Sequence, residues 1–244
     1  MEDKALLSTE VASGTEKAEL LIVIPAYNEA ENIERVVNHL TANFPQYDYV
    51  VVNDGSRDET AAICQRNGYN LLNLPVNLGL AGAFQAGLKY ADKYGYQYAV
   101  QLDGDGQHRP EYLESMIKKM EEGYDIVIGS RFVGEKTPFT MRMLGSNLIE
   151  MAIRFTTGVN IKDPTSGMRM FSKRMIREFA SGLNYGPEPD TVSYLIRQGA
   201  RVAEVPVIMD ERILGVSYLT PVNAMRYMLK MLISILLIQN FRKR

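Results

Sequence analysis

Residues 96–110, YQYAVQLDGDGQHRP, contain the features that decide the fold. The run Tyr96–Leu102 is apolar enough to form a buried strand, and it ends abruptly in the polar turn Asp103–His108. Pro110 suits the first turn of a helix that we expect to reach about Glu122. This succession of strand, polar turn and helix is typical of a parallel sheet that binds ligands at the carboxyl ends of its strands.

A regular alternation of strands and helices surrounds this stretch. Short apolar runs predict strands at Leu20–Pro25, Tyr49–Asn53, Tyr69–Leu74 and Asp125–Gly129. Helical spacing predicts helices at Ala30–Leu40, Ser56–Asn67, Leu80–Lys93 and Met141–Phe155. Further along, we expect an extended segment at Arg169–Phe171, a helix at Thr191–Gln198 and a strand at Arg201–Val207. Strand–helix units repeated in this way predict an α/β fold with a mostly parallel sheet flanked by helices.

The second of these helices carries its own start signal. Ser56 followed three residues later by Glu59 is a capping-box pattern, so we expect the helix to begin there.

Composition and charge exclude several classes of protein. The 244 residues include 27 Lys and Arg against 29 Asp and Glu, a net charge of −2, which argues against a nucleic-acid-binding domain. Hydrophobic residues make up 46%, enough for one sizeable core and a single domain. The one cysteine, Cys64, excludes an internal disulfide framework and a cysteine-based zinc site. It falls in an apolar-periodic stretch, which favours a buried small residue over a nucleophile.

The two ends of the chain differ in character. Residues 1–18 are polar and lack the pattern of a signal peptide, so we expect a disordered tail and a cytoplasmic protein. Residues 219–244 include the mainly apolar run 224–238, with a polar stripe at Asn223, Arg226, Lys230 and Ser234 and a basic end. We expect an amphipathic helix that docks on an anionic membrane surface or a small membrane protein. The alternative is a helix that packs on the core of its own domain.

Polar or glycine-bearing clusters follow all five strands of the first half. They are Pro25–Glu29, Asn53–Ser56, Asn77–Gly79, Asp103–His108 and Ser130–Arg131. One such cluster is an ordinary turn, because Asn, Asp and Gly dominate turns. Since the carboxyl ends of parallel strands share one edge of a sheet, five clusters together predict a ligand-binding rim.

The fourth cluster has the chemistry of a metal site. Asp103 and Asp105 are two residues apart at a strand end with Gly104 between them, and Gln107 adds a neutral oxygen. Carboxylate oxygens suit Mg²⁺ or Mn²⁺, which hold few protein ligands and bridge to substrate phosphates. The chain has no P-loop, no complete dinucleotide-binding glycine pattern, no calcium-loop spacing and no hydrolase elbow. These absences argue against a P-loop kinase and a nicotinamide dehydrogenase.

Seven segments in order resemble the family 2 glycosyltransferases of GT-A (Rossmann-like) fold, with a match over about 19–218. The segments are IPAYNEAENI (24–33), VVNDGSRDET (51–60), NLGLAGAFQAGL (77–88), LDGDGQH (102–108), DIVIGSRF (125–132), DPTSGMRMF (163–171) and AEVPVIMDER (203–212). The fifth and sixth are most similar to the dolichol- and polyprenyl-phosphate hexose synthases. The resemblance implies a nucleotide-sugar donor, a divalent cation and inversion at the anomeric carbon.

The resemblance also implies roles on the donor side. The residues implied to bind the nucleotide-sugar are Pro25, Tyr27, Glu29, Asp54, Asp103, Gly104, Asp105, Arg131 and Arg212. Among them, Asp54 is expected to accept a hydrogen bond from the base, and the two arginines to face phosphates. Asp103, Asp105 and Gln107 are the expected metal ligands. Asp105 and Arg131 are also expected to be catalytic, because they stabilise charge on the leaving diphosphate.

The acceptor decides the second half of the reaction. A lipid phosphate is already anionic near neutral pH and needs cationic partners rather than a base. Lys162, Ser166 and Arg169 are candidates to bind it, together with Arg131. A hydroxyl acceptor needs a general base.

Two carboxylates stand where a base is expected. Glu188 and Asp190 fall in the loop Gly186–Asp190, in a segment where many family 2 enzymes carry an acidic residue, and we expect both to be catalytic.

The hypothesis from sequence is a hexosyltransferase that acts at the inner face of the cell membrane, where it associates peripherally. It moves a hexose from a nucleotide-sugar, for which we favour a UDP-sugar, to polyprenyl phosphate or a related lipid-linked acceptor. The alternatives are transfer to a sugar hydroxyl of a growing polysaccharide and a nucleotide-binding scaffold subunit without turnover.

Overall fold

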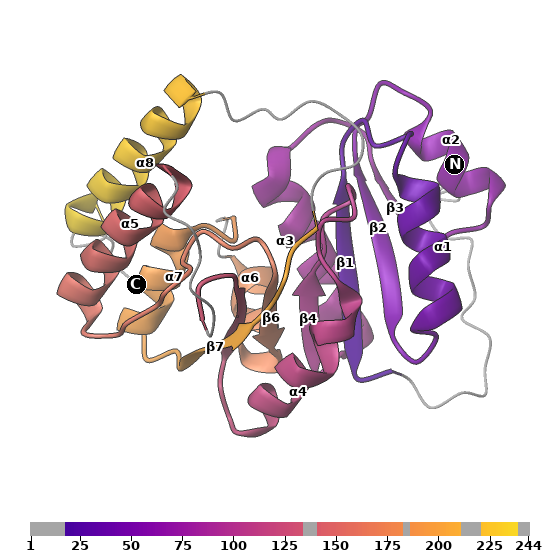
Figure 1. Ribbon diagram of the computed structural model, residues 1–244. Helices are drawn as coiled ribbons and strands as arrows, with labels where there is room; N and C mark the ends of the chain where they lie inside the picture. Colours follow the sequence, from indigo (N-terminus) through magenta and orange to yellow (C-terminus); the bar gives the residue numbers. More distant parts are fainter. Residues whose placement is uncertain (1–17, 134–140, 183–185, 211–220, 239–244) are drawn as a thin grey trace.

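The computed structural model describes residues 18–133, 141–182, 186–210 and 221–238 (Figure 1). Its strands are β1 (Leu20–Ala26), β2 (Asp48–Asp54), β3 (Leu71–Leu74), β4 (Tyr98–Gln101), β5 (Ile126–Ser130), β6 (Arg169–Ser172) and β7 (Val202–Pro206). Its helices are α1 (Ile33–Asn43), α2 (Thr60–Arg66), α3 (Gly79–Tyr94), α4 (Leu113–Glu121), α5 (Met141–Thr157), α6 (Lys173–Ser181), α7 (Pro189–Arg197) and α8 (Pro221–Leu236). A short 3-10 turn, Pro110–Tyr112, leads into α4.

The described strands form one seven-stranded sheet in the order β3-β2-β1-β4-β6-β5-β7. All neighbours are parallel except at β6, which runs antiparallel to both β4 and β5. The expected α/β fold with a mostly parallel sheet is therefore confirmed. Because β6 runs the opposite way, its first residue lies at the carboxyl ends of its neighbours, where Arg169 is in register with Gln101 and Ile128. The residues directly before β6 therefore lie at the carboxyl edge of the sheet, where the ligand-binding rim was predicted.

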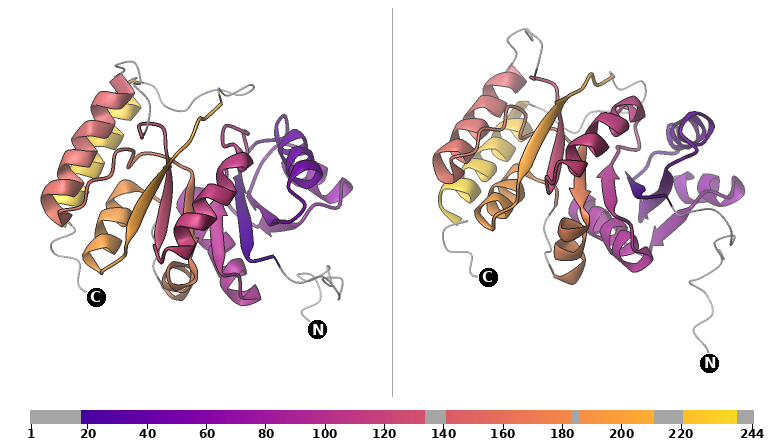
Figure 2. Two further views of the ribbon diagram at one scale, coloured as in Figure 1. Left: turned by 60° about the horizontal axis from the view of Figure 1, so that its bottom comes forward. Right: turned by 90° about the horizontal axis from the view of Figure 1, so that it is seen from below.

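Helices cover both faces of the sheet. In the right-hand view of Figure 2, α1 and α4 lie on one side and α3 and α6 on the other. The central strand β1 alternates between the two layers. Leu21 and Val23 join one buried cluster, whereas Leu20, Ile22 and Ile24 join the other. A strand buried on both faces reads as a continuous apolar run, which is the pattern that predicted it.

The capping-box prediction at Ser56 and Glu59 is wrong. Helix α2 begins at Thr60, whose backbone N–H donates to Asp58 Oδ1 at 3.0 Å, and its cap position has no side-chain hydrogen bond. The Ser56 hydroxyl instead accepts the backbone N–H of Asn28 from the first-strand cluster. A tertiary contact therefore uses the group that the local pattern assigned to the helix.

Helix α6 was not predicted from the sequence.

Helix α8 packs on the domain and still presents an apolar outer face. It lies beside α5 (Figure 2) and against α7, and its Met231 and Ile235 belong to the main core cluster. Ser234, expected on an outer polar stripe, is buried, whereas Arg226 and Lys230 are exposed. One face of α8 therefore packs on the domain, as the packing alternative expected. No helix among the described residues is long and apolar enough to span a bilayer. Nearly all of the expected tail, 1–18, falls outside the described residues.

The thiol of Cys64 tests the packing around α2. Its residue is fully buried, and burial raises the pKa of the thiol to about 11. Because only the thiolate is a good nucleophile, we expect no reaction of the native protein with a thiol reagent at pH 8 over minutes, and rapid reaction in guanidinium chloride. Fast labelling of the native protein would contradict the burial of this helix face.

Candidate active site

The first two polar clusters interlock at the carboxyl edge of the sheet. Asn28, the one non-glycine residue with positive φ (57°) among the described residues, turns the chain so that its side chain accepts the backbone N–H of Arg57 at 2.9 Å. The backbone N–H of Glu29 donates to the Thr60 hydroxyl at 2.9 Å. Glu29 also accepts from the side-chain amide of Asn32. These bonds fix the turns after β1 and β2 against each other.

The second and third clusters meet at Asp54. Its Oδ1 accepts the backbone N–H of Leu78 at 2.7 Å, and its carbonyl accepts the side-chain amide of Asn77 at 3.0 Å. Gly55 has φ +63°, and a Cβ there would stand 2.6 Å from the backbone nitrogen of Asn77. Only glycine allows this close approach. Asp54 is almost fully buried. One of its carboxylate oxygens is already bonded to the backbone N–H of Leu78, directly before α3.

The Asp103–Gly106 turn packs on the first cluster. A Cβ at Gly104 would lie 3.1 Å from the carbonyl oxygen of Pro25 and 3.4 Å from Glu29 Cγ. The turn after β4 is therefore in contact with the turn after β1. Tyr27, in the same cluster, is 36% exposed, which leaves its ring available to a ligand. Donor-side candidates from three strands are thus adjacent at one edge, as the sequence predicted for the rim.

The two acidic residues of this turn have unlike surroundings. The side chain of Asp103 is 36% exposed, and its carboxylate accepts the side-chain amide of Gln101 at 2.9 Å. Asp105 is 5% exposed, and its Oδ1 accepts the backbone N–H of Gln107 at 3.0 Å. Arg35 donates to the carbonyl of Asp105 at 2.9 Å.

His108 supports the same turn, a role that the sequence did not reveal. Its Nδ1 accepts the backbone N–H of Asp103 at 3.0 Å, so the hydrogen bond assigns the ring proton to Nε2. That nitrogen lies 3.6 Å from Asp103 Oδ2. The imidazole therefore holds the backbone of Asp103 and lies beside its carboxylate.

The donor set of this turn fits a hard divalent cation. Asp103 and Asp105 offer carboxylate oxygens, the ligands that Mg²⁺ and Mn²⁺ prefer. Among the described residues, no three His, Cys, Asp or Glu side chains are grouped so as to hold a metal by themselves. Such ions keep few protein ligands and complete their shell with water and substrate phosphates, so two carboxylates suffice.

Gln107 ties this turn to the segment after β7. Its side-chain nitrogen donates to the carbonyl of Asp210 at 3.2 Å, and the backbone N–H of Asp210 donates to the Gln107 carbonyl. Arg109 forms an ion pair with Asp210 and, by that hydrogen bond, holds the pKa of the Asp210 carboxyl below its usual range. Arg212, the expected second phosphate-facing arginine, lies outside the described residues.

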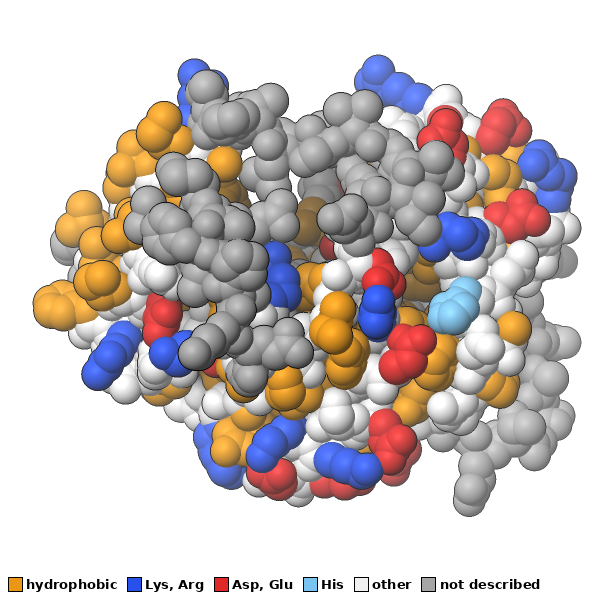
Figure 3. All heavy atoms as spheres, viewed as in Figure 1, with side chains coloured by type: hydrophobic (Ala, Val, Ile, Leu, Met, Phe, Trp, Pro, Cys, Tyr) orange, Lys and Arg blue, Asp and Glu red, His pale blue; other side chains and the backbone are white. Residues whose placement is uncertain are grey.

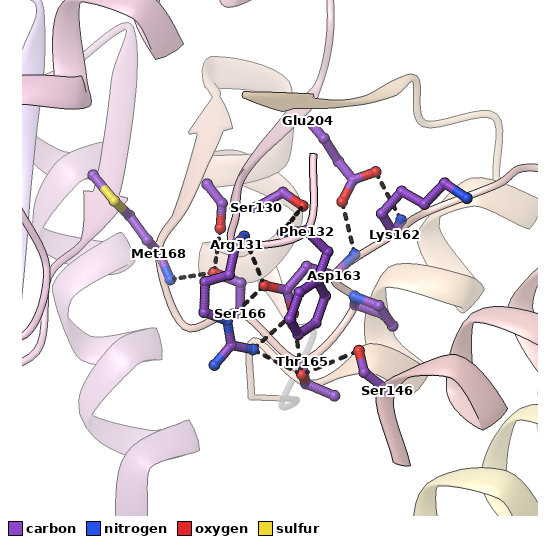
Figure 4. Close-up of polar contacts among 12 residues, drawn as sticks. Ser130, Arg131, Phe132, Ser146, Lys162, Asp163, Thr165, Ser166, Met168 and Glu204 are labelled. Atoms are coloured by element: carbon purple, nitrogen blue, oxygen red, sulfur yellow. Dashed lines mark hydrogen bonds and ion pairs between the residues drawn. The ribbon is translucent and has the colours of Figure 1, made fainter. Parts of the chain in front are cut away.

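Arg131 is held by a buried carboxylate (Figure 4). Its Nε and one terminal nitrogen each donate to an oxygen of Asp163 at 2.7 Å, and that nitrogen also donates to Thr165. The Asp163 side chain has no exposed surface, whereas that of Arg131 is 19% exposed. In Figure 4 the other terminal nitrogen of Arg131 carries no dashed contact and points away from Asp163. Arg131 is thus a rigidly held cation, and among the described residues no hydrogen bond involves its other terminal nitrogen.

Glu204 of β7 holds the backbone of the loop that carries Asp163. Its two carboxylate oxygens accept the backbone N–H groups of Lys162 and Asp163, at 2.7 and 2.8 Å. Strand β7 pairs with β5, and Glu204 is in register with Ile128 two residues before the end of β5. The sequence contains Asp163 and Glu204 within recognised segments but gives no sign that they work together, because they are 41 residues apart.

The predicted acceptor residues are brought near one another but not into one open site. Lys162 is exposed and its ammonium lies 3.4 Å from Glu150. Ser166 is buried and donates to the carbonyl of Gly129 at 2.5 Å. Arg169 is fully buried, and burial lowers the pKa of its guanidinium from the usual value. Its nitrogens donate to the backbone carbonyls of Ser166, Pro164 and Pro187.

These contacts change the tasks expected of Ser166 and Arg169. Both side chains hold loop backbone in the interior, so in this arrangement neither presents a free group to an acceptor phosphate. All three nitrogens of Arg169 donate hydrogen bonds to backbone carbonyls, so the side chain acts as a structural cross-link. Arg131 is the member of the expected set that retains a partly exposed cation close to the rim.

The two acidic candidates lie at the start of α7. Glu188 is the cap residue and Asp190 lies in the first turn. Asp190 Oδ1 accepts the backbone N–H of Thr191 at 2.9 Å, and Oδ2 accepts the Ser234 hydroxyl at 2.6 Å. Glu188 accepts the Tyr227 hydroxyl. Carboxylates at this position are also favourable to the helix itself, because they face its amino-terminal dipole.

Comparison with known proteins finds a family and relatives of this chain. Residues 21–179 match the model of the family described as Glycosyl transferase family 2. A polyprenol monophosphomannose synthase from Mycolicibacterium smegmatis is 32% identical over 224 residues, covering 86% of this chain and 84% of that protein. An undecaprenyl-phosphate mannosyltransferase from Micrococcus luteus is 31% identical over 210 residues, covering 81% of this chain and 86% of that protein.

A solved structure shows the same fold. Glucosyl-3-phosphoglycerate synthase from Mycobacterium tuberculosis, in complex with Mn²⁺, UDP-glucose and phosphoglyceric acid, superposes with a TM-score of 0.66 at 18% identity. The similarity covers 92% of this chain and 80% of that one. At this identity it supports the fold class and nothing beyond it.

Replacing Glu204 by Gln tests the support of Arg131. The amide keeps one accepting oxygen but turns a donor toward the second backbone N–H, so we expect a loss of about 1–3 kcal/mol in the free energy of unfolding. Chemical denaturation measures this loss. Glu121→Gln on the exposed side of α4 is the matched control and is expected to change it by less than about 0.5 kcal/mol. Equal effects of the two substitutions would show that Glu204 does not hold the turn.

Proposed function

The chain belongs to glycosyl transferase family 2 and is a glycosyltransferase; from this premise we propose that it transfers a hexose from a nucleotide-sugar to polyprenyl phosphate. The proposed reaction is metal-dependent, inverts the anomeric carbon and uses a UDP-sugar. The observation that carries the acceptor is Arg131, a partly exposed cation held rigidly near the rim that also bears Asp103 and Asp105. The names of the two relatives, which refer to polyprenyl-type phosphates and mannose, support the same acceptor class.

On the donor side, the chain's residues hold the nucleotide and stabilise the leaving group. We assign Pro25, Tyr27, Glu29 and Asp54 to the nucleoside, and Asp103, Gly104 and Asp105 to the ribose and diphosphate. Leaving-group departure puts negative charge on the diphosphate and positive charge on the sugar ring. Asp103 and Asp105, with Gln107 as a third ligand, would hold a divalent cation, which would offset the charge on the diphosphate. Arg212 is assigned to the same diphosphate.

On the acceptor side, the chain's residues attract and orient a phosphate. With a second pKa of about 6, a phosphate monoester is anionic at neutral pH and attacks without a general base. A terminal nitrogen of Arg131 is the proposed donor to it, and exposed Lys162, whose ammonium lies 3.4 Å from Glu150, is proposed as a second cationic partner. Ser166 and Arg169 contribute by holding the loop that presents Asp163 to Arg131.

A second candidate acceptor is a sugar hydroxyl. The observation in its favour is the pair of carboxylates at the start of α7, Glu188 and Asp190, because a hydroxyl acceptor needs a base. A third candidate, a nucleotide-binding scaffold subunit without turnover, is disfavoured by the retention of both acidic residues in the Asp103–Gly106 turn and of Arg131.

Location at the inner face of the cell membrane completes the proposal. Helices α5 and α8 expose a set of large apolar side chains that gather at the left end of Figure 3: Leu148, Met151, Phe155, Met225, Leu229, Ile233, Leu236, Leu237 and Ile238. Exposed Arg154, Arg226 and Lys230 accompany them, and Glu150 is the one acidic residue on the described parts of the two helices, 145–157 and 224–238. Apolar side chains flanked by cations suit an anionic lipid surface. A small membrane protein is the alternative occupant.

The reaction is tested with a radiolabelled donor, polyprenyl phosphate and Mn²⁺. Transfer to the lipid is expected with a UDP-sugar in preference to GDP- and dTDP-sugars. It should cease on chelation by EDTA and return on addition of Mn²⁺ or Mg²⁺. Asp105→Ala should lower kcat by about 100-fold, because the leaving group loses electrostatic support. Asp92→Ala, a surface carboxylate on α3, is the control and should retain full rate.

Three results would contradict parts of this proposal. Wild-type rate in Asp105→Ala removes the metal role. Transfer to an oligosaccharide hydroxyl but not to polyprenyl phosphate establishes the second candidate. Binding of nucleotide-sugar by calorimetry without turnover on either acceptor establishes the scaffold.

Membrane docking is tested by sedimentation with lipid vesicles. The protein should bind vesicles that contain phosphatidylglycerol more tightly than vesicles of phosphatidylcholine, and less tightly as salt rises. Phe155→Ser and Leu229→Ser should each weaken binding about tenfold, since a buried large apolar side chain contributes about 1.5–3 kcal/mol. Binding only to membranes that contain protein would favour the membrane-protein partner instead.

A further inference from the structure

Helix α8 directs two hydroxyl groups inward, toward the start of α7. Tyr227 is four residues before Met231 and packs against the core cluster, and Ser234 is buried three residues after Met231, so both lie on the face that joins the core. Tyr227 donates a hydrogen bond to Glu188 Oε2, and Ser234 donates to Asp190 Oδ2 at 2.6 Å. The two carboxylates singled out as candidate catalytic groups are thus both bonded to the same distant helix.

The protonation state of Tyr227 suits this role. Burial, together with the negative charge of Glu188, raises the pKa of the Tyr227 hydroxyl above its usual value. The group therefore stays protonated at any working pH and remains a donor to the carboxylate. A hydrogen bond to a charged acceptor in a dry environment is stronger than a typical neutral one.

Arg169 holds the same loop from the opposite side. Its guanidinium donates to the carbonyl of Pro187, directly before Glu188, and to the carbonyls of Pro164 and Ser166. The positive charge of this fully buried side chain also balances the carboxylates around it. The loop 186–190 is therefore clamped between a buried arginine and the hydroxyl groups of α8.

We propose that α8 is a positioning element of the active site: through Tyr227 and Ser234 it sets the orientation of Glu188 and Asp190. Its kinetic consequence rests on the second candidate of the proposed function, transfer to a sugar hydroxyl, in which Glu188 or Asp190 acts as the base. Tyr227 and Ser234 are positioning residues and touch no substrate. The same helix thus carries the proposed lipid-facing side chains on one face and the support of the acidic loop on the other.

A first measurement of this assignment is independent of any enzymatic activity. Tyr227→Phe removes the hydroxyl and keeps the ring, so the core packing of α8 should remain. We expect amide hydrogen exchange to rise at least threefold in the first turn of α7, where the Val192 N–H donates to the Glu188 carbonyl, and to stay unchanged in α4. Tyr69→Phe, which removes an exposed hydroxyl bonded to Asn38, is the matched control. Unchanged exchange in Tyr227→Phe would overturn the inference.

The second measurement compares variants in the transfer assay. Tyr227→Phe and Ser234→Ala should each lower kcat about tenfold with the donor KM within about twofold of wild type, as expected for loss of a hydrogen bond to a charged group. Ser115→Ala, which removes a hydroxyl bonded to the Tyr112 carbonyl, is the control for the serine. A fall in stability with kcat retained would mean that the two hydroxyls only help the chain to fold.

A double-mutant cycle decides whether Tyr227 acts through Glu188. We expect Glu188→Gln to lower kcat, and the Glu188→Gln, Tyr227→Phe double variant to be no slower than Glu188→Gln alone. If the kcat losses of the two single variants multiply in the double variant, the inference is overturned. So would a wild-type kcat in Glu188→Gln, although the transfer reaction would then still stand. If the wild-type protein transfers no sugar at all, the proposed function fails, and the exchange measurement alone decides the positioning role.

Discussion

The ion pair between Arg131 and Asp163 is the interaction on which the rim depends. Asp163 has no contact with solvent, and a buried carboxylate without its partner is strongly unfavourable. The two-pronged contact with Arg131 satisfies it and, in return, keeps the guanidinium in one orientation. Removal of either member leaves the other charge uncompensated. The sheet edge therefore keeps a fixed positive group before any substrate arrives.

The direction of β6 and the position of Arg131 after β5 bring the two members of this ion pair together. The antiparallel strand β6 brings the 163–168 segment to the carboxyl ends of β4 and β5, and Arg131 directly follows β5. Glu204 then joins the backbone of that segment to β7. Arg169 extends the same connection to Pro187 and so to the start of α7. Cation, acidic loop and outer helix consequently belong to one continuous polar framework beneath the rim.

The strands and the polar rim were predictable from the sequence because apolar period and turn residues are local properties. The direction of β6 was not, since alternation reports which face a residue occupies and not which way its strand runs. The start of α2 was missed because Asn28, distant in sequence, takes the hydroxyl of Ser56. Ser166 and Arg169 were recognised as unusual, but residue type does not reveal that backbone carbonyls already occupy the donors of Arg169. Tyr227 and Ser234 looked like parts of a separate helix for the same reason: their partners lie far away along the chain.

The close approach of α5 and α8 has a consequence for the thermodynamics of docking. A Cβ at Gly145 would stand 2.0 Å from Met228 Sδ, so the glycine leaves room for this side chain where the two helices meet. Their exposed apolar side chains form a surface that is already folded. An amphipathic tail, in contrast, must first form a helix when it binds. Ordering a coil costs about 1–2 kcal/mol of backbone entropy per residue. Because α5 and α8 are already folded, the proposed attachment to a lipid surface avoids this penalty and should be nearly free of the heat that accompanies helix formation.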